Sequence, residues 1–276
     1  MAKTKSTFTC SECGWVTTKW VGKCAQCQGW GTLEENAPEH RVTALAPTTP
    51  ARPITDVETT ASTRTSSGIG ELDRVLGGGL VPGGVILLAG EPGVGKSTLL
   101  LHVSATLSRI SERPVLYVSG EESASQVRLR AERIGAMSSS LHLAAESDLQ
   151  RILGHVSSTS PSLLVVDSVQ TIVDSGVDGA AGGVAQVRAV TSGLVQLAKA
   201  ENLPVLLVGH VTKDGSIAGP RVLEHLVDVV CQFDGDRHSQ LRMIRAAKNR
   251  YGPVSYTHLT LPTILRSCRS RWSPYH

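Results

Sequence analysis

Apolar runs and segments of helical periodicity alternate along most of this chain. Buried strands are predicted at 85–89, 115–119, 141–144, 163–166 and 205–209. The segments between them fit covering helices at 96–110, 123–134, 147–156 and 185–201. Because strands and helices alternate, we expect an α/β fold with a mainly parallel central sheet. Two later apolar segments, 227–233 and 240–246, predict further strands and a hairpin that turns near residue 235.

The pattern is different before residue 67, and it divides the chain into parts. Residues 1–33 hold four closely spaced cysteines and three of the four tryptophans, which indicates a small separate module. Residues 34–66 are rich in Thr, Ala and Pro and predict a linker. The alternating domain is expected at 67–254, and residues 255–276 form a tail without clear periodicity.

Composition limits the classes of function without selecting one. The net charge of +3 comes from the tail, which carries three arginines and no acidic residue, so the rest of the chain is neutral. A neutral chain lacks the excess of basic residues that is typical of nucleic-acid-binding proteins. An aromatic content of 4% argues against a protein that holds single strands mainly by base stacking. No apolar window approaches the roughly 18 residues of a membrane helix and no signal peptide is recognisable. We therefore expect a cytoplasmic protein without membrane partners.

Four cysteines near the N-terminus have the spacing of a metal site. Cys10 and Cys13 form one Cys-x2-Cys pair, and Cys24 and Cys27 form a second pair after ten intervening residues. Four thiolates at this spacing close a tetrahedron around Zn²⁺, so we expect a structural zinc ribbon whose folding depends on the metal. A redox Cys-x2-Cys is the weaker alternative, because no thioredoxin-like unit accompanies these pairs. Cys231 lies in an apolar strand and is expected to be an inert core thiol.

A complete Walker A sequence follows the first predicted strand of the α/β domain. It consists of Gly90, Glu91, Pro92, Gly93, Val94, Gly95, Lys96, Ser97 and Thr98. The glycines allow backbone N–H groups to converge on phosphates, and the helix that follows adds the positive end of its dipole. We expect Lys96 to reach the β- and γ-phosphates of ATP, and the Ser97 hydroxyl to bind Mg²⁺. A chance glycine-rich turn is the alternative.

Carboxylates at the ends of two further strands are candidates for the remaining chemistry. Asp167 ends an apolar run, and we expect it to be the Walker B acid that holds Mg²⁺ directly or through water. Glu121 and Glu122 follow the strand at 115–119, and we expect one of them to orient the attacking water. Both glutamates could instead stabilise the first turn of the next helix.

With these motifs in place, the sequence resembles the RadA (Sms) family of RecA-like ATPases, which acts in bacterial DNA repair. The resemblance runs from Cys10 to about Gly252. It rests on the cysteine pairs, the phosphate loop and the segments 29–33, 71–83, 117–123, 167–171, 209–213 and 248–252. Together these motifs are far more specific than any one of them.

The resemblance implies a DNA-dependent ATPase that forms a hexameric ring around single-stranded or branched DNA. It also implies a role in recombination, by branch migration of joint molecules, together with a recombinase of the RecA type. Lys248 and Arg250 match the family's Lys-Asn-Arg-Phe-Gly motif and would act catalytically across a subunit boundary, although Tyr251 replaces the Phe. On sequence alone, a solvated strand end is the simpler interpretation of Lys248 and Arg250.

RecA-like relatives contact DNA through two loops after the Walker B strand. The stretches 174–184 and 213–221 lie in the matching places, and Arg188, Lys213 and Arg221 are the candidate phosphate contacts. Both stretches could instead be flexible connections. His210 resembles the family's link between the nucleotide and a DNA loop, although a lone histidine beside a strand is more often a packing residue.

The chain departs from the family after residue 253. Family members continue into a domain similar to the Lon protease, whereas residues 254–259 fit neither that domain nor a clear structure. We therefore expect a truncated or chimeric chain with an atypical, non-native tail. Two other hypotheses stay open, a nucleotide switch that works through protein partners and a chain that binds ATP and zinc without turnover.

Overall fold

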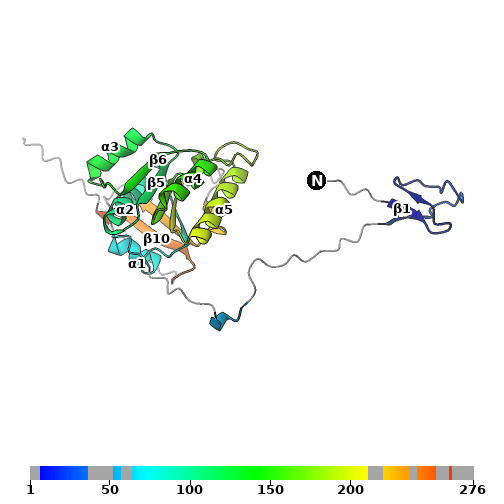
Figure 1. The fold of residues 1–276 in the computed structure, drawn as a ribbon, viewed down its shortest axis with the longest axis horizontal. Helices are drawn as coiled ribbons and strands as arrows, with labels where there is room; N and C mark the ends of the chain where they lie inside the picture. Colours follow the sequence, from blue (N-terminus) through cyan, green and yellow to red (C-terminus); the bar gives the residue numbers. More distant parts are fainter. Residues whose placement is uncertain are drawn as a thin grey trace, which may run out of the picture. The chain divides into compact units, whose positions relative to one another are not determined.

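The computed structural model describes residues 7–36, 52–56, 64–210, 220–235, 241–252 and 261–262. The chain divides into two compact units, residues 1–58 and 59–276, and each has a sheet of its own (Figure 1). Among the described residues, no helix combines the length and apolar character needed to cross a bilayer.

The first unit contains a small antiparallel sheet. Its strands are β1 (Thr7–Cys10), β2 (Val16–Thr17) and β3 (Leu33–Asn36), in the order β2-β1-β3, and a 3-10 turn, η1 (Ile54–Asp56), follows them. Its core consists of Cys10, Cys24 and Leu33, with Phe8 and Trp15 packed against them. So small a core does not stabilise a fold unaided. The strand β3 runs three residues past the predicted ribbon, because it pairs residue for residue with β1.

The second unit is an α/β domain. Its helices are α1 (Gly70–Leu76), α2 (Lys96–Ile110), α3 (Ala124–Ile134), α4 (Leu149–Thr159), η2 (Val169–Thr171), α5 (Val184–Glu201) and α6 (Pro220–Glu224). Its strands are β4 (Val85–Gly90), β5 (Val115–Ser119), β6 (Leu141–Ala145), β7 (Leu163–Asp167), β8 (Val205–His210), β9 (Val229–Gly235), β10 (Leu241–Asn249) and β11 (Leu261–Pro262). All belong to one sheet of order β11-β10-β9-β4-β8-β7-β5-β6. Neighbours from β9 to β6 are parallel and β10 and β11 are antiparallel, so the predicted mainly parallel sheet is confirmed.

Helices cover both faces of this sheet. Figure 1 shows α1, α2 and α3 on one side of the strands and α4 and α5 on the other. Alternate residues of β4 serve the two layers, since Ile86 and Leu88 belong to one core cluster and Leu87 to the other. The thiol of Cys231 is buried in the first cluster, and burial raises its pKa to about 12, as expected of an inert core thiol.

Local side-chain bonds set several element boundaries that the apolar pattern did not fix. The helix α3 begins after Ser123, which forms a capping box with Gln126. The helix α4 begins two residues later than predicted, because the Asp148 side chain accepts the amide of Arg151 and caps the helix. The predicted hairpin of β9 and β10 is confirmed, and the residues that would turn it, 236–240, lie outside the described residues.

Candidate nucleotide site and four-cysteine site

The phosphate loop is a sharp turn between β4 and α2. The strand ends at Gly90, where a β-carbon would lie 2.3 Å from the carbonyl oxygen of Phe233 on β9, so only glycine fits. Gly95 has a φ of +110° and lies directly before Lys96, the first residue of α2. The first turn of α2 therefore points its backbone N–H groups into the loop, which is the arrangement that binds phosphate.

Lys96 lies across the loop that precedes it. Its Nζ donates hydrogen bonds of 2.8 Å to the carbonyl oxygens of Gly90 and Glu91, and the residue is 4% exposed. Burial lowers the pKa of Lys96, while the negative charges of Asp167 and Glu121 act in the opposite direction. The ammonium group therefore shares one electrostatic environment with both predicted carboxylates.

Asp167 ends β7 beside the phosphate loop and is held by a tyrosine. The hydroxyl of Tyr117, on the neighbouring strand β5, donates a 2.6 Å hydrogen bond to Asp167 Oδ2. Burial, followed by the charge of Asp167, raises the pKa of Tyr117 well above its usual range. The hydroxyl therefore stays protonated and fixes one oxygen of a carboxylate that is 7% exposed.

Glu121 lies where three parallel strands end. The Ser168 hydroxyl, which follows β7, donates to Glu121 Oε1, and His210 Nε2 at the end of β8 lies 3.1 Å from the same oxygen. The Gly120 amide bonds the Asp167 carbonyl at 2.9 Å, so the ends of β5 and β7 are joined through the backbone as well. Because the carboxyl ends of parallel strands meet at one edge, Lys96, Asp167 and Glu121 are brought together.

Glu122 points into a different environment. Its carboxylate accepts a hydrogen bond from the guanidinium of Arg130, a residue of α3. Its backbone amide donates to the Ser119 hydroxyl at 3.0 Å. The structure thus separates two adjacent glutamates that the sequence could not distinguish. Glu121 faces the phosphate loop and its neighbours, whereas Glu122 fastens the start of α3.

Two buried polar atoms belong to His210, which the sequence analysis named, and to Gln170, to which it gave no role. Among the described residues, Gln170 Oε1 and His210 Nδ1 have no hydrogen-bond partner, although Gln170 Nε2 donates to the His210 carbonyl at 3.4 Å. Ser168 and Tyr117 were also missed. Their contacts join segments about fifty residues apart in sequence, which no local pattern reveals.

Lys248 and Arg250 lie near the amino-terminal ends of the parallel strands, opposite the phosphate loop. Lys248 Nζ donates to the carbonyl of Val227 at 2.8 Å, and Arg250 Nη1 pairs with the buried Asp228 at 3.2 Å. The other oxygen of Asp228 accepts the amide of Val85, the first residue of β4, at 3.1 Å. Because the length of β4, roughly 16 Å, separates this end of the sheet from the loop, neither side chain lies near the loop of its own chain.

The candidate DNA contacts are only partly within the described residues. Arg188 is exposed on α5, whereas Lys213 and the side chain of Arg221 lie outside them. The first candidate DNA loop is folded rather than loose. The buried Gln186 accepts the amide of Asp174 at 2.8 Å and donates to the carbonyls of Val177 at 2.5 Å and Gly179 at 3.4 Å.

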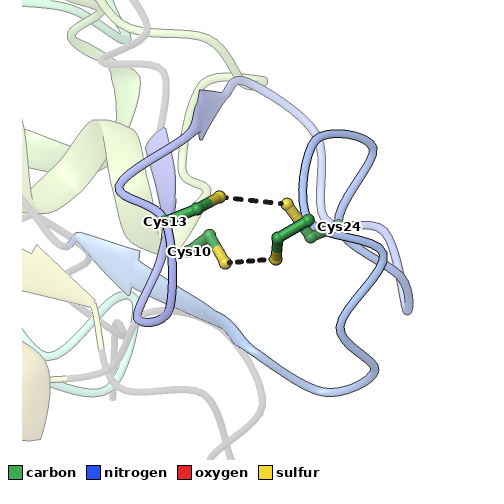
Figure 2. A group of neighbouring side chains, drawn as sticks. Cys10, Cys13 and Cys24 are labelled. Carbon is green, nitrogen blue, oxygen red and sulfur yellow. Dashed lines mark hydrogen bonds between the residues drawn. The ribbon is translucent and has the colours of Figure 1, made fainter.

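The four N-terminal cysteines converge on one point. The Sγ atoms of Cys10 and Cys27 lie 3.7 Å apart and those of Cys13 and Cys24 3.6 Å apart, and all four sulfur atoms lie within 4.8 Å of one another (Figure 2). A tetrahedral Zn²⁺ with bonds of about 2.3 Å would need sulfur atoms about 3.8 Å apart. The thiol set therefore fits a closed, four-coordinate metal ion with no position left for a substrate.

These features define a P-loop nucleotide-binding α/β domain of the RecA-like type joined to a zinc ribbon. Residues 51–216 match the family described as AAA domain, and residues 8–35 match the family described as Rubredoxin metal binding domain. The chain belongs to the AAA domain family and is a homologue of bacterial RadA proteins.

Three relatives illustrate this homology. The DNA repair protein RadA of Mycolicibacterium smegmatis is 55% identical over 265 residues, covering 91% of this chain and 56% of the relative. RadA of Bacillus subtilis is 48% identical over 263 residues, covering 92% and 57%. RadA of Streptococcus pyogenes serotype M6 is 46% identical over 260 residues, again covering 92% and 57%. The chain thus spans little more than half the length of these curated relatives.

Proposed function

We propose that the second unit binds ATP with Mg²⁺ and hydrolyses it, and that hydrolysis is coupled to DNA in recombinational repair. The main support is the convergence of Lys96, Asp167 and Glu121 at the carboxyl edge of the sheet, beside a phosphate loop. The relatives are named DNA repair proteins, which supports the DNA-directed part of the proposal.

The loop from Gly90 to Thr98 would hold the triphosphate through its backbone N–H groups, with Lys96 on the β- and γ-phosphates. A hydroxyl and a carboxylate are ligands that Mg²⁺ prefers, so Ser97 and Asp167 fit this ion. Bound Mg²⁺ neutralises charge that develops on the phosphate oxygens. Tyr117 limits the freedom of Asp167, so the carboxylate is already oriented before nucleotide binds.

Glu121 is the group that we assign to the attacking water. It is partly exposed at the nucleotide edge, while Ser168 and His210 both bond one of its oxygens and leave the other available. A carboxylate in this position can orient a water molecule and accept its proton. Glu122 has no such role in the proposal, because Arg130 occupies its carboxylate.

The position of Lys248 and Arg250 supports assembly of several copies. Both lie at the edge remote from their own phosphate loop, so a neighbouring copy in a hexameric ring would receive them at its nucleotide. A guanidinium supplied in this way can stabilise charge on the γ-phosphate. Hydrolysis would then require that neighbouring copies have assembled.

The proposed partners are single-stranded or branched DNA and a recombinase of the RecA type, with branch migration as the outcome. Arg188, Lys213 and Arg221 would contact phosphates, which predicts binding that is sensitive to salt and largely independent of sequence. The four-thiolate site would hold Zn²⁺ as a structural ion, and it needs reduced cysteines, which favours action in the cytoplasm.

The first prediction concerns the dependence of hydrolysis on DNA. Single-stranded DNA is expected to raise the ATPase rate, and Lys96→Ala is expected to lower it by a factor on the order of 100 or more, because a charge stabiliser is lost. Phosphate release with and without DNA is the measurement. Lys199→Ala, an exposed lysine near the end of α5, is the matched control and should behave as the unmodified chain.

Equal hydrolysis with and without DNA, together with a co-purifying protein, would favour the nucleotide-switch hypothesis. Nucleotide binding without hydrolysis, and without an increase in molecular size on adding ATP, would show instead that this chain binds nucleotide but does not turn it over.

A further inference from the structure

Two tryptophans of the first unit are exposed side by side on its surface. Trp20 is 64% exposed and Trp30 77% exposed, whereas Trp15 packs against the small core around Cys10. A β-carbon on Gly22 would lie 3.9 Å from the Trp20 ring and 3.9 Å from the Trp30 ring, so both indoles border the space left by this glycine. Neither ring contributes to the core, so packing does not explain them.

The charged side chains next to these two rings are both lysines. Lys23 Nζ lies 5.8 Å from the centroid of the Trp30 ring, and Lys19 directly precedes Trp20. Residues 13–33 contain both lysines and no aspartate or glutamate, while the acidic residues of the ribbon lie in the Glu12 turn and on β3. Exposed rings beside ammonium groups match a polyanion that carries aromatic bases.

We propose that Trp20, Trp30, Lys19 and Lys23 form a stacking platform for single-stranded DNA. Bases would stack on the indole faces, and the lysines would contact the adjoining phosphates. Duplex DNA is a poorer ligand, because its base faces are already stacked on one another. This inference deepens the proposed function by assigning single-strand capture to the ribbon.

Stacking supplies most of the affinity in this arrangement. The four thiolates of the neighbouring metal site carry negative charge of their own, and two lysines alone would attract DNA weakly. Each phosphate contact with a single strand contributes about 0.7 to the slope of log affinity against log salt. Replacing both lysines by glutamine should therefore reduce that slope by about 1.4 and leave ring stacking intact.

The test measures binding of a fluorescein-labelled oligothymidylate to the full chain by anisotropy, with a duplex of equal length as competitor. The double variant Trp20→Ala, Trp30→Ala should weaken binding by about 25-fold or more, since each stacked base loses about fivefold or more. The variant Trp20→Phe, Trp30→Phe keeps two ring faces and should restore much of the affinity. Basal ATPase without DNA should stay unchanged in all these variants.

The matched control is Ile110→Ala, Leu129→Ala. These side chains are 66% and 65% exposed in the second unit, so their replacement removes comparable apolar surface without touching the ribbon. Metal content, measured by release on thiol modification, verifies that the ribbon stays folded.

Equal affinity of the alanine variant and the unmodified chain for oligothymidylate would overturn the proposal. Loss of a co-purifying protein with unchanged DNA binding would overturn it as well and assign the surface to a protein partner. Failure of the proposed ATPase is recognised separately, because Lys96→Ala tests the nucleotide site without altering the ribbon.

Discussion

The bond between Tyr117 and Asp167 illustrates what single residues decide in this site. A buried carboxylate can rotate unless a donor fixes it, and the Tyr117 hydroxyl fixes one oxygen at 2.6 Å. The donor role requires a protonated hydroxyl, and burial raises the pKa of Tyr117 well above 10, so the bond persists at physiological pH.

We predict that Tyr117→Phe raises the Mg²⁺ concentration needed for half-maximal ATPase. The substitution keeps the ring but leaves Asp167 Oδ2 without its donor, which costs about 1–3 kcal/mol of unfolding free energy. ATPase titrations with Mg²⁺, combined with urea unfolding, measure both effects. An unchanged Mg²⁺ requirement would show that Tyr117 has only a structural role.

The same residue gives a pH dependence with a definite sign. Because the pKa of Tyr117 is raised in the folded state, its stabilising contribution is complete below pH 10 and is lost as pH rises above that value. Tyr117→Phe should remove this alkaline loss. Tyr251→Phe is the matched control for the Mg²⁺ titration, since Tyr251, whose pKa is raised to about 12, lies at the remote edge of the sheet.

At this scale the sequence predicted the residues that belong to known motifs, but it did not predict the residues that hydrogen-bond to them. The Walker A residues and Asp167 follow from spacing within a short segment. Tyr117 and Ser168 act on residues about fifty positions away, and only the pairing of β5 with β7 brings them together. Local periodicity contains no information on such contacts.

At the scale of elements, the start of α3 separates the roles of two glutamates. Ser123 caps the helix and Arg130 binds Glu122 from within it, so Glu122 is fixed to α3 while Glu121 stays with the strand ends. Sequence reasoning left either glutamate as the catalytic group, because adjacent residues share the same local pattern.

This difference is tested with two matched substitutions. Glu121→Gln should lower the ATPase rate by about 10²- to 10⁴-fold with nucleotide binding retained, because only the proton acceptor is lost. Glu122→Gln should keep most of the rate and lower thermal stability slightly, through its ion pair with Arg130. Stopped hydrolysis in Glu122→Gln with normal hydrolysis in Glu121→Gln would reverse our assignment.

Most elements of the α/β domain could be predicted from apolar runs, since strands buried on both faces give continuous hydrophobic segments. Ends were less predictable. The strand β9 begins two residues later than expected, because the amides of Leu226 and Val227 bond the Leu223 carbonyl and continue the turn after α6. Such turn bonds depend on where the helix happens to end.

At the scale of the molecule, the phosphate loop and Arg250 lie at opposite ends of the strands of the sheet. The phosphate loop follows the carboxyl end of β4, and Arg250 is tied through Asp228 to its amino end. In the proposed mechanism one copy would therefore not complete its own site, and a head-to-tail ring would bring the two ends of neighbouring sheets together.

Mixing two inactive variants tests this arrangement. Lys96→Ala and Arg250→Ala should each lose most ATPase activity, the second because an arginine supplied by a neighbour is worth on the order of 10³-fold or more. Random one-to-one mixing creates about a quarter of interfaces with both residues intact, so activity should recover to a comparable fraction. No recovery, with mixed assembly verified by size, would contradict action across a boundary.

The average composition of the chain conceals a local feature of its first unit. Three of four tryptophans lie within residues 1–33, and the structure divides them into one core ring and two exposed rings. An average aromatic content of 4% argued against base stacking by the protein as a whole. It does not exclude a small platform on one unit, because exposure is a property of three-dimensional placement.

The side-chain amide of Gln186 forms hydrogen bonds with residues 174, 177 and 179. Three positions of this loop are therefore attached to one residue in the first turn of α5. We expect the loop and the first turn of α5 to move together, because these bonds join them. If DNA contacts this loop, as proposed, it would therefore act directly on the N-terminal end of α5, whose 18 residues span about 27 Å of the domain.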